Sequence, residues 1–497
     1  MGQGHGDRLS TVDAAFLHME TPTQHMHVGG LFVFDAADAD GFDYARFLEL
    51  VRSRLHLVPR YRQKLAFAPF NLSAPAWVDD REFDLSYHVR HAALPRPGTT
   101  EQLMEYAARI LSRPLDRDRP LWELYVIEGM SENRFAVLGK NHHAMIDGLA
   151  GIDIATVMLD VSPDPPDPIP DPEPWEPAPA PSGYELAWSG VLDLAASPRS
   201  LLDRVLEVAQ APRDTLKAAI EAAEGLVSFA SSSLRRPAPP SPLNQPPGIH
   251  RRFAIERLAL ERFKDVKNAF DATVNDVVLA VVADATGRLL RARGIDTEGL
   301  WLRAMVPVSV RAPEDRHALG NRIVSVFVDL PMFEMDPAER LRVCHEAMQD
   351  VKEQHQAVGA GFLIGLAQFA PPTLHAMASR AASRSRLFNF LVTNVPGPQM
   401  PIYCLGARLL GAFPFAPLAA TQSYAVGLTS IDGWMNFGFT GDYKAVPDLD
   451  DVPEHLVAAL EELEASADAV DVRHELAQKP PTGELSVEEI EQRVAGS

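Results

Sequence analysis

The segment Asn141-His142-His143-Ala144-Met145-Ile146-Asp147-Gly148 is the part of the sequence that points most directly to a fold. It follows the apolar run 135–138, which has the length and composition of a buried strand. Side chains alternate across a strand, so the two imidazoles should lie on opposite sides and should not bind one metal ion together. We therefore expect one histidine to face a cleft while the other is held inside.

The residues after this histidine pair suggest how a catalytic histidine would work. Asp147 lies four positions after His143 and precedes Gly148, which tolerates a tight turn, so the carboxylate could fix the loop or anchor another element. No Ser or Cys stands beside the pair, and the chain has no G-x-S-x-G motif. A catalytic histidine would then activate a hydroxyl of a substrate. The alternative for either histidine alone is a structural or surface role.

The His-His-x-x-x-Asp-Gly spacing resembles the acyltransferase superfamily of chloramphenicol acetyltransferase and peptide-synthetase condensation domains. Further short matches, in the same order along nearly the whole chain, are similar to the bacterial wax ester synthase/diacylglycerol acyltransferase family. These matches are 9–17 with 26–30, Pro120-Leu121-Trp122, Asn275-Asp276, 307–311 with Gly320-Asn321, and 393–398. Thr393 stands where the family has serine, and this change keeps the hydroxyl.

The resemblance implies an α/β fold of two chloramphenicol-acetyltransferase-like lobes with a substrate channel between them. Acyl-CoA would enter from one side and a lipophilic alcohol from the other. By motif position His143 is the catalytic base and His142 supports the loop. Asp147 would pair with an arginine, for which Arg311 is the candidate; the alternative is that Arg311 faces solvent at a strand end.

Other motif residues are assigned either to the site or to the scaffold around it. Asn275 could orient a substrate or polarise a carbonyl, but the segment 274–276 could also simply cap a helix. Structural roles near the channel are expected for Pro120, Trp122 and Asn394, and site-organising roles for Gly148 and Asn321. We interpret His18, His25 and His27 as polar surface or interface residues, because they show no metal-ligand spacing.

Apolar patterning predicts alternating strands and helices on both sides of a Pro-rich region. The predicted strands are 31–34, 124–127, 135–138, 301–308 and 324–329, and the predicted helices are 44–57, 101–112, 259–270, 274–293 and 337–356. Proline is concentrated at 161–181 and 237–247, flanking a segment with helical periodicity within 185–230. We therefore predict an N-terminal lobe (1–160), a linker region (161–248), a C-terminal lobe (249–475) and a disordered tail (476–497).

Composition excludes several classes of partner and compartment. The chain has 46 Lys and Arg against 67 Asp and Glu, a net charge of −21, so nucleic acid is a poor partner. Cys344 and Cys404 form neither a zinc spacing nor a disulfide framework, which fits a reducing cytoplasm. The first ten residues do not resemble a signal peptide. The cysteines are expected to be small buried hydrophobic residues.

Coenzyme A is anionic, so its binding to an acidic chain would need local basic patches. The sequence offers two, Arg235, Arg236, Arg251 and Arg252 around the second Pro-rich segment, and Arg380, Arg384 and Arg386. Either could bind phosphates or lipid head groups, or could be a solvated face. The segment 354–379 has no charged residue and could insert at a lipid surface or pack into the C-terminal lobe.

Together these observations favour an acyl-CoA-dependent O-acyltransferase without metal or bound organic cofactor, located in the cytoplasm at the inner membrane or lipid bodies. The preferred acceptor is diacylglycerol, which would give triacylglycerol. The alternatives are a fatty alcohol, which would give a wax ester, or an enzyme that uses both acceptors. A metal-dependent hydrolase and a non-catalytic lipid-binding or lipid-droplet protein are the rival functions. The oligomeric state stays open.

Overall fold

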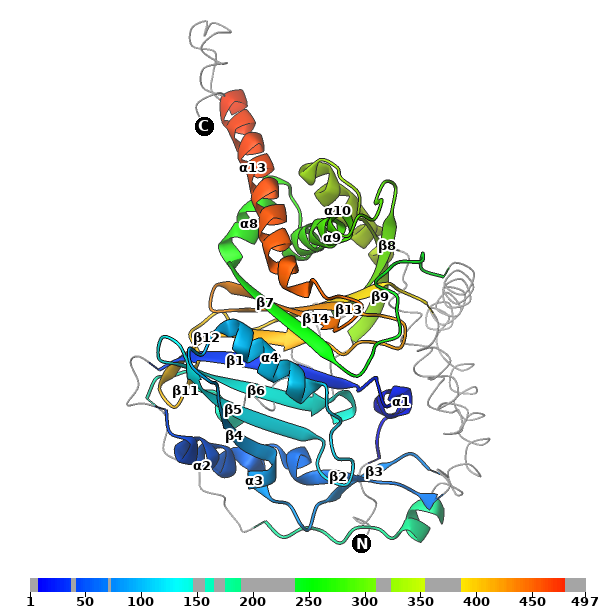
Figure 1. Cartoon of the computed structure of the whole chain (residues 1–497), viewed down its shortest axis with the longest axis vertical. Coiled ribbons are helices and arrows are strands. Elements are labelled where there is room, and N and C mark those ends of the chain that lie inside the picture. The colour runs from blue at the N-terminus through cyan, green and yellow to red at the C-terminus, as the bar shows by residue number, and fades with distance from the viewer. Residues whose placement is uncertain are drawn as a thin grey trace, which may run out of the picture.

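The computed structural model describes residues 8–36, 42–69, 73–145, 157–164, 175–188, 237–309, 323–353 and 386–478. Its frame is a pair of six-stranded mixed sheets, which lie one above the other in Figure 1. The first sheet has the order β11-β12-β1-β6-β5-β4 and the second has the order β7-β14-β13-β10-β8-β9. A short hairpin of β2 (Gln63–Ala66) and β3 (Ala76–Asp79) lies beside the first sheet.

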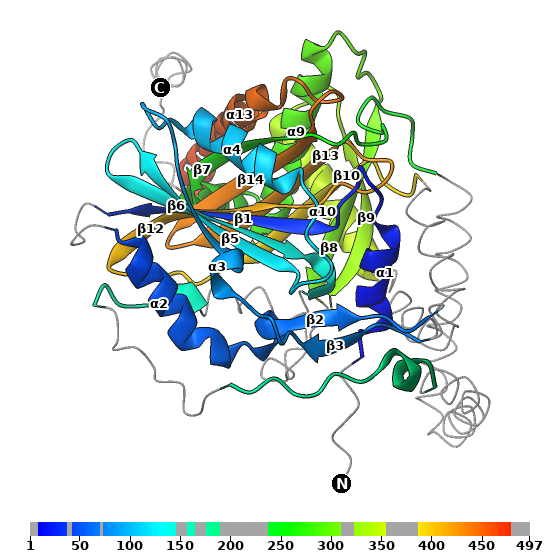
Figure 2. The same ribbon diagram turned by 60° about the horizontal axis from the view of Figure 1, so that its bottom comes forward.

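The first sheet carries the histidine pair. Its strands are β1 (His27–Asp35), β4 (Val89–Ala93), β5 (Trp122–Met130), β6 (Arg134–His142), β11 (Tyr403–Cys404) and β12 (Ala407–Phe415). One face packs against α4 (Thr100–Leu111), which begins with a capping box between Thr99 and Gln102 and buries Leu103, Ala107 and Ile110. The other face is covered by α2 (Tyr44–Arg54) and α3 (Leu85–His88), with α1 (Thr11–Met19) at the end of the sheet (Figure 2).

The second sheet carries a layer of helices on its far side (Figure 1). Its strands are β7 (Arg251–Ala259), β8 (Trp301–Ser309), β9 (Ile323–Pro331), β10 (Phe390–Pro396), β13 (Tyr424–Ile431) and β14 (Trp434–Asp442). The helices are α8 (Leu260–Ala269), α9 (Val274–Ala292), α10 (Pro337–Glu353) and α13 (Val452–Gln478). The central helix, α9, is buried along most of its length, as its nearly continuous apolar sequence predicts.

The two sheets are not each built from one half of the chain. β12 leaves the C-terminal half and pairs antiparallel with β1, with Leu31 opposite Phe413. It also lies against β13 and β14 of the second sheet, and the contact is so close that a Cβ at Gly438 would lie 2.2 Å from the Pro414 carbonyl oxygen. Glycine at this position therefore allows the sheets to approach.

The predicted elements are found with small shifts at their ends. The five predicted strands lie within β1, β5, β6, β8 and β9, and the five predicted helices correspond to α2, α4, α8, α9 and α10. The α/β fold is confirmed. Of the predicted helical segment 185–230, only residues 185–188 are described, and they belong to a helix over 183–188. Cys344 and Cys404 are fully buried, as predicted.

The described parts of both Pro-rich segments run along the surface of the sheets. The Ala178 N–H donates to Asp79 Oδ2 at the end of β3 (2.9 Å), and the Ala238 N–H donates to the Arg386 carbonyl before β10 (2.8 Å). Extended Pro-rich backbone is suited to such docking because it leaves its carbonyls and remaining N–H groups free to pair. Among the described helices, none is long and apolar enough to cross a membrane.

Candidate active site

The two histidines lie where β6 ends. His142 is the last residue of the strand, opposite His27 of β1, and His143 begins the short 3-10 helix η4 (His143–Met145). His142 is 1% exposed beside Glu20, whereas the His143 ring stacks on Phe16 of α1. The two rings therefore have different partners, and their placement on opposite sides of the strand stays a prediction.

His143 is held by its backbone and shielded by an aromatic ring. Its N–H donates to the Met26 carbonyl (2.7 Å), and the ring centroid lies 3.8 Å from that of Phe16 at an interplanar angle of 17°. Burial lowers the pKa of His143 to about 4, because a charged imidazolium loses its hydration there. The imidazole is therefore neutral near pH 7 and can accept a proton.

His142 contacts both the loop and a carboxylate. Its Nδ1 accepts the Ala144 N–H (3.0 Å), so Nδ1 carries no proton and the tautomer is assigned with the proton on Nε2. That Nε2 lies 3.2 Å from Glu20 Oε1. His142 thus ties the backbone of η4 to the segment after α1, which agrees with the predicted loop-supporting role.

Sequence reasoning did not identify Glu20. Its Oε1 accepts the Met26 N–H (2.9 Å), and its Oε2 accepts from Arg117. Burial alone would raise the pKa of Glu20, but His142, Arg117 and His27 together hold that pKa far below its usual range. The sequence offers one signal for Glu20, an acidic residue directly after the first helix. That signal is weak, because the partners of Glu20 are distant in sequence.

His27 is not the surface or interface residue that we expected. It is 6% exposed, and its Nε2 lies 3.6 Å from Glu20 Oε1. Burial lowers the pKa of His27 well below its usual value. The β1–β6 register places it beside His142 on the inner face of the sheet, which short-range spacing could not reveal. A small cavity nearby is lined by His27 of the first sheet, by His25 just before it, and by Arg251, Phe253 and Thr440 of the second sheet.

The described members of the two predicted basic patches make contacts within the protein, and their binding of phosphates stays a prediction. Arg251 is 7% exposed and donates to the carbonyls of Gly248 (2.7 Å) and Thr23 (2.7 Å). Arg252 pairs with Asp450 at 2.8 Å, and Arg386 Nε donates to the Ala238 carbonyl. These arginines serve structural contacts, because a guanidinium satisfies buried carbonyls with several donors. Arg235, Arg236, Arg380 and Arg384 lie outside the described residues.

The motif residues Pro120 and Trp122 support the site from the interior. Trp122 is fully buried, its Nε1 donates to the Tyr61 carbonyl (2.8 Å), and its ring stacks on His88 at 4.6 Å. Pro120 is also buried. These contacts agree with the predicted structural role, since a large aromatic side chain fills the space between layers.

Asn275 and Asn394 both lie in the second half of the fold. The N-cap of α9 is Thr273, which forms a capping box with Asp276, so the capping role is filled without Asn275. Asn275 is half-buried in the first turn, and its contact with substrate stays a prediction. Asn394 is half-buried on β10, opposite Leu428 of β13.

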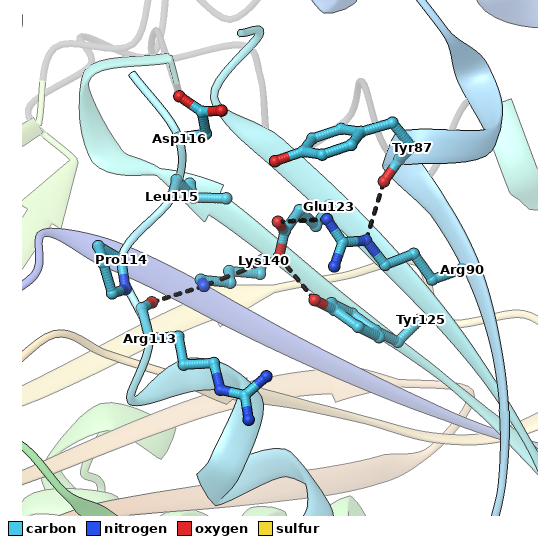
Figure 3. Close-up of a pocket in the computed structure, with 9 residues that line it drawn as sticks. All are labelled: Tyr87, Arg90, Arg113, Pro114, Leu115, Asp116, Glu123, Tyr125 and Lys140. Carbon is cyan, nitrogen blue, oxygen red and sulfur yellow. Dashed lines mark hydrogen bonds and ion pairs between the residues drawn. The ribbon is translucent and has the colours of Figure 1, made fainter. Parts of the chain in front are cut away.

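A cavity of about 330 Å³ is lined by residues that include Arg90, Glu123, Tyr125 and Lys140 (Figure 3). Lys140 is 1% exposed, and its Nζ donates to the carbonyls of Ile110 (3.2 Å) and Arg113 (2.6 Å). Glu123 accepts from Arg90 (3.1 Å) and from the Tyr125 hydroxyl (2.8 Å). Burial lowers the pKa of Lys140 to about 8. These polar groups satisfy one another, which favours a structural role for them. Lys140 lies two residues before His142 on β6.

Several predicted positions cannot be placed. Asp147, Gly148, Arg311 and Asn321 lie outside the described residues, and so does the uncharged segment 354–379. The predicted pairing of Asp147 with Arg311 therefore stays a prediction. Within the described part of the chain, no three His, Cys, Asp or Glu side chains gather as metal ligands would.

Comparison with known proteins places this site in a family. Residues 9–278 match the family model for the wax ester synthase/diacylglycerol acyltransferase catalytic domain, and residues 319–464 match the model for the C-terminal domain of the same family. A Mycobacterium tuberculosis protein named "Putative diacyglycerol O-acyltransferase" is 35% identical over 464 residues, covering 92% of this chain and 90% of that protein. Another from this species, named "Probable diacyglycerol O-acyltransferase", is 33% identical over 469 residues, covering 92% and 99%.

Solved structures agree on the fold. The wax ester synthase/diacylglycerol acyltransferase from Marinobacter aquaeolei VT8 superposes with a TM-score of 0.64 at 28% identity, covering 93% of this chain and all of that one. The first condensation domain of the calcium-dependent antibiotic synthetase superposes with a TM-score of 0.55 at 15% identity, covering 94% and 97%. The second likeness concerns the fold alone. With both family models matched, the chain belongs to the wax ester synthase/diacylglycerol acyltransferase family and is an acyltransferase.

Proposed function

We propose that this acyltransferase moves a fatty acyl group from acyl-CoA to the free hydroxyl of diacylglycerol, forming triacylglycerol and CoA. The family implies an acyl-CoA donor and an acyl acceptor. The names of the mycobacterial relatives favour diacylglycerol as that acceptor. The family name and the Marinobacter structure keep a long-chain alcohol, and hence a wax ester, as the second candidate.

The observation that carries the chemistry is a neutral, half-buried imidazole at a fixed position. His143 takes the proton from the acceptor hydroxyl as the oxygen attacks the thioester carbonyl carbon. The carbon–sulfur bond then breaks, and the departing thiolate takes the proton from the imidazolium, so His143 ends neutral. A positioned general base accelerates such a step by typically about 10²- to 10⁴-fold. Substrate positioning and stabilisation of the oxyanion supply the rest.

The reaction needs no metal and no bound organic cofactor, because the thioester already carries an activated acyl group and the base is part of the chain. Diacylglycerol is too apolar to diffuse freely in water, so we propose that the enzyme works in peripheral contact with an inner membrane or a lipid body. The uncharged segment 354–379 is the proposed contact.

The test uses purified protein with labelled palmitoyl-CoA and either dioleoylglycerol or hexadecanol, followed by separation of the neutral lipids. We expect labelled triacylglycerol as the main product and a loss of at least about 100-fold in turnover for His143→Ala. His91→Ala is the matched control, because His91 is half-exposed and pairs with Glu128 at the edge strand β4. Hexadecyl palmitate as the main product would favour the wax ester function.

No product from either acceptor would favour the non-catalytic lipid-binding alternative. Turnover by a folded His143→Ala protein at the wild-type rate would contradict His143 as the base. Vesicle flotation with diacylglycerol-containing liposomes tests the lipid contact separately, because a non-catalytic lipid-binding protein would also float.

A further inference from the structure

We propose that Glu20 is a positioning residue that holds both histidines of the site through one carboxylate oxygen. This inference deepens the proposed function, since it names a residue outside the HHxxxDG motif that the acyl transfer would require. Glu20 is largely buried, with 11% of its side chain exposed, and it lies immediately after α1. Its two oxygens have different partners, and each partner restrains a different part of the site.

The first restraint acts on His142. Because Nδ1 of His142 accepts the Ala144 N–H, the ring proton lies on Nε2, and that nitrogen lies 3.2 Å from Glu20 Oε1, within ion-pair distance. A carboxylate beside a histidine N–H fixes the tautomer and the ring orientation, as outer partners of catalytic histidines do. If the ring flipped or changed tautomer, the Ala144 N–H in the first turn after His143 would lose its acceptor.

The second restraint acts on His143 through the main chain. Glu20 Oε1 also accepts the Met26 N–H at 2.9 Å, and the carbonyl of the same Met26 accepts the His143 N–H at 2.7 Å. Glu20 is therefore connected to the proposed base by two hydrogen bonds, one to the N–H and one to the carbonyl of Met26. A shift of Glu20 would move Met26 and with it the backbone on which the His143 ring is mounted.

Arg117 keeps the carboxylate in this orientation. It donates to Glu20 Oε2 and to the Leu17 carbonyl near the end of α1 (3.3 Å), so Oε2 is occupied and Oε1 is left for Met26 and His142. Arg117 also makes the burial of a negative charge tolerable, because an unpaired buried carboxylate would be protonated instead. The loop between α4 and β5, which carries Arg117, is thereby coupled to the catalytic pair.

Glutamine at position 20 cannot replace this arrangement. With its oxygen toward Met26 and His142, the amide NH₂ group faces Arg117, and two donors then oppose each other. With the amide reversed, the NH₂ group faces the Met26 N–H and the His142 Nε2–H instead. Neither orientation satisfies both ends, although glutamine has nearly the same volume as glutamate, so packing is preserved.

The experiment compares Glu20→Gln, Arg117→Lys and Arg117→Met with the wild type in the palmitoyl-CoA and dioleoylglycerol assay. Glu128→Gln is the matched control, since Glu128 pairs with a histidine (His91, 2.8 Å) far from the site. We expect kcat of Glu20→Gln to fall roughly 10- to 100-fold, as for a lost hydrogen bond to a charged group, with KM for palmitoyl-CoA within about twofold. Arg117→Lys should retain more kcat than Arg117→Met, because lysine keeps the positive charge.

A second readout does not depend on turnover. Nitrogen NMR of protein labelled at histidine nitrogens reports which ring nitrogen carries the proton, with the His142 signals identified by their absence in His142→Gln. We expect the Nε2–H tautomer in the wild type and a mixed population in Glu20→Gln. If the wild type forms no product, the proposed function fails, and the tautomer result still decides the role of Glu20.

The inference is overturned by a kcat of Glu20→Gln within twofold of the wild type, or by a His142 tautomer that the substitution leaves unchanged. Should Glu20→Gln not fold, the two Arg117 variants decide: equal losses of kcat in Arg117→Lys and Arg117→Met would show that the charge at this position does not act on the histidines. Thermal melting of each variant identifies a loss that follows from unfolding.

Discussion

The low pKa of His143 predicts an unusual pH dependence of acyl transfer. With a pKa of about 4, about 97% of His143 is neutral at pH 5.5, whereas an ordinary histidine with a pKa of about 6.5 would be about 9% neutral. Because only the neutral imidazole can act as a base, kcat/KM should change by less than about a tenth between pH 7.5 and 5.5. An ordinary histidine would give a loss of about tenfold over the same range.

Phe16 is the perturbation that tests the cause of this low pKa. Its ring covers the His143 imidazole at 3.8 Å and keeps water from it. Phe16→Leu removes much of that cover, hydrates the imidazolium, and should raise the pKa of His143 toward its ordinary value by about one unit. Phe42→Leu is the control, because it removes the same aromatic mass but Phe42 packs on Phe47 and Phe135.

The assay is the initial rate of triacylglycerol formation from pH 4.5 to 8.5 at constant ionic strength, with circular dichroism at each pH to confirm folding. An acid limb of kcat/KM near pH 6.5 in the wild type would refute the argument, because it would show a hydrated imidazole. An acid limb that stays in place in Phe16→Leu would show that the ring does not set the pKa.

Three further predictions concern Trp122, the pH dependence of stability, and metal dependence. Trp122→Ala should lower the free energy of unfolding by about 3 to 5 kcal/mol in urea titrations, because the fully buried ring leaves a cavity and the Tyr61 carbonyl loses its donor; a loss below about 1 kcal/mol would contradict this packing. The pKa of His143 is lower in the folded chain than in the unfolded chain, so below pH 6.5 the unfolded chain takes up a proton that the folded chain does not. The free energy of unfolding is therefore unaffected by His143 above pH 6.5 and falls by about 3 kcal/mol as pH decreases from 6.5 toward 4. His143→Gln should remove that part of the pH dependence, and urea midpoints at pH 7 and 4.5 for both proteins measure it. Prolonged dialysis against a chelator should leave acyl transfer unchanged, and stoichiometric metal with chelator-sensitive turnover would favour the hydrolase alternative.

The parts of the fold that could be predicted are those with local causes. Apolar runs such as 135–138 and the periodic segment 274–293 specify a strand and a helix by themselves, and both are found. The transfer of β12 to the first sheet has no local signal, because its sequence would suit a strand in either sheet. What decides its place is packing between Pro414 and the glycines of β13 and β14, which is a long-range effect.

The site shows the same division between local and long-range information. The motif located His142 and His143, whose rings contact different partners, Glu20 and Phe16. His27 was misassigned because its burial depends on pairing with a strand more than 100 positions away. Glu20 was missed for a related reason: its partner Arg117 lies 97 positions along the chain, and a single acid after a helix is ordinary in sequence.

The junction of the two sheets explains how a site served by two substrates can keep its geometry. β12 is hydrogen-bonded into the first sheet and lies against the second, so main-chain pairing holds the lobes in register. Arg251 of β7 adds a second connection, because its guanidinium donates to the Thr23 carbonyl and its N–H donates to Ser112 Oγ at 2.9 Å, both in the first lobe. Thr23 lies in the turn between Glu20 and Met26, so the segment that positions His143 is itself tied to the second lobe. A movement of one lobe relative to the other would therefore displace His143. This favours an enzyme whose lobes keep their relative position during acyl transfer.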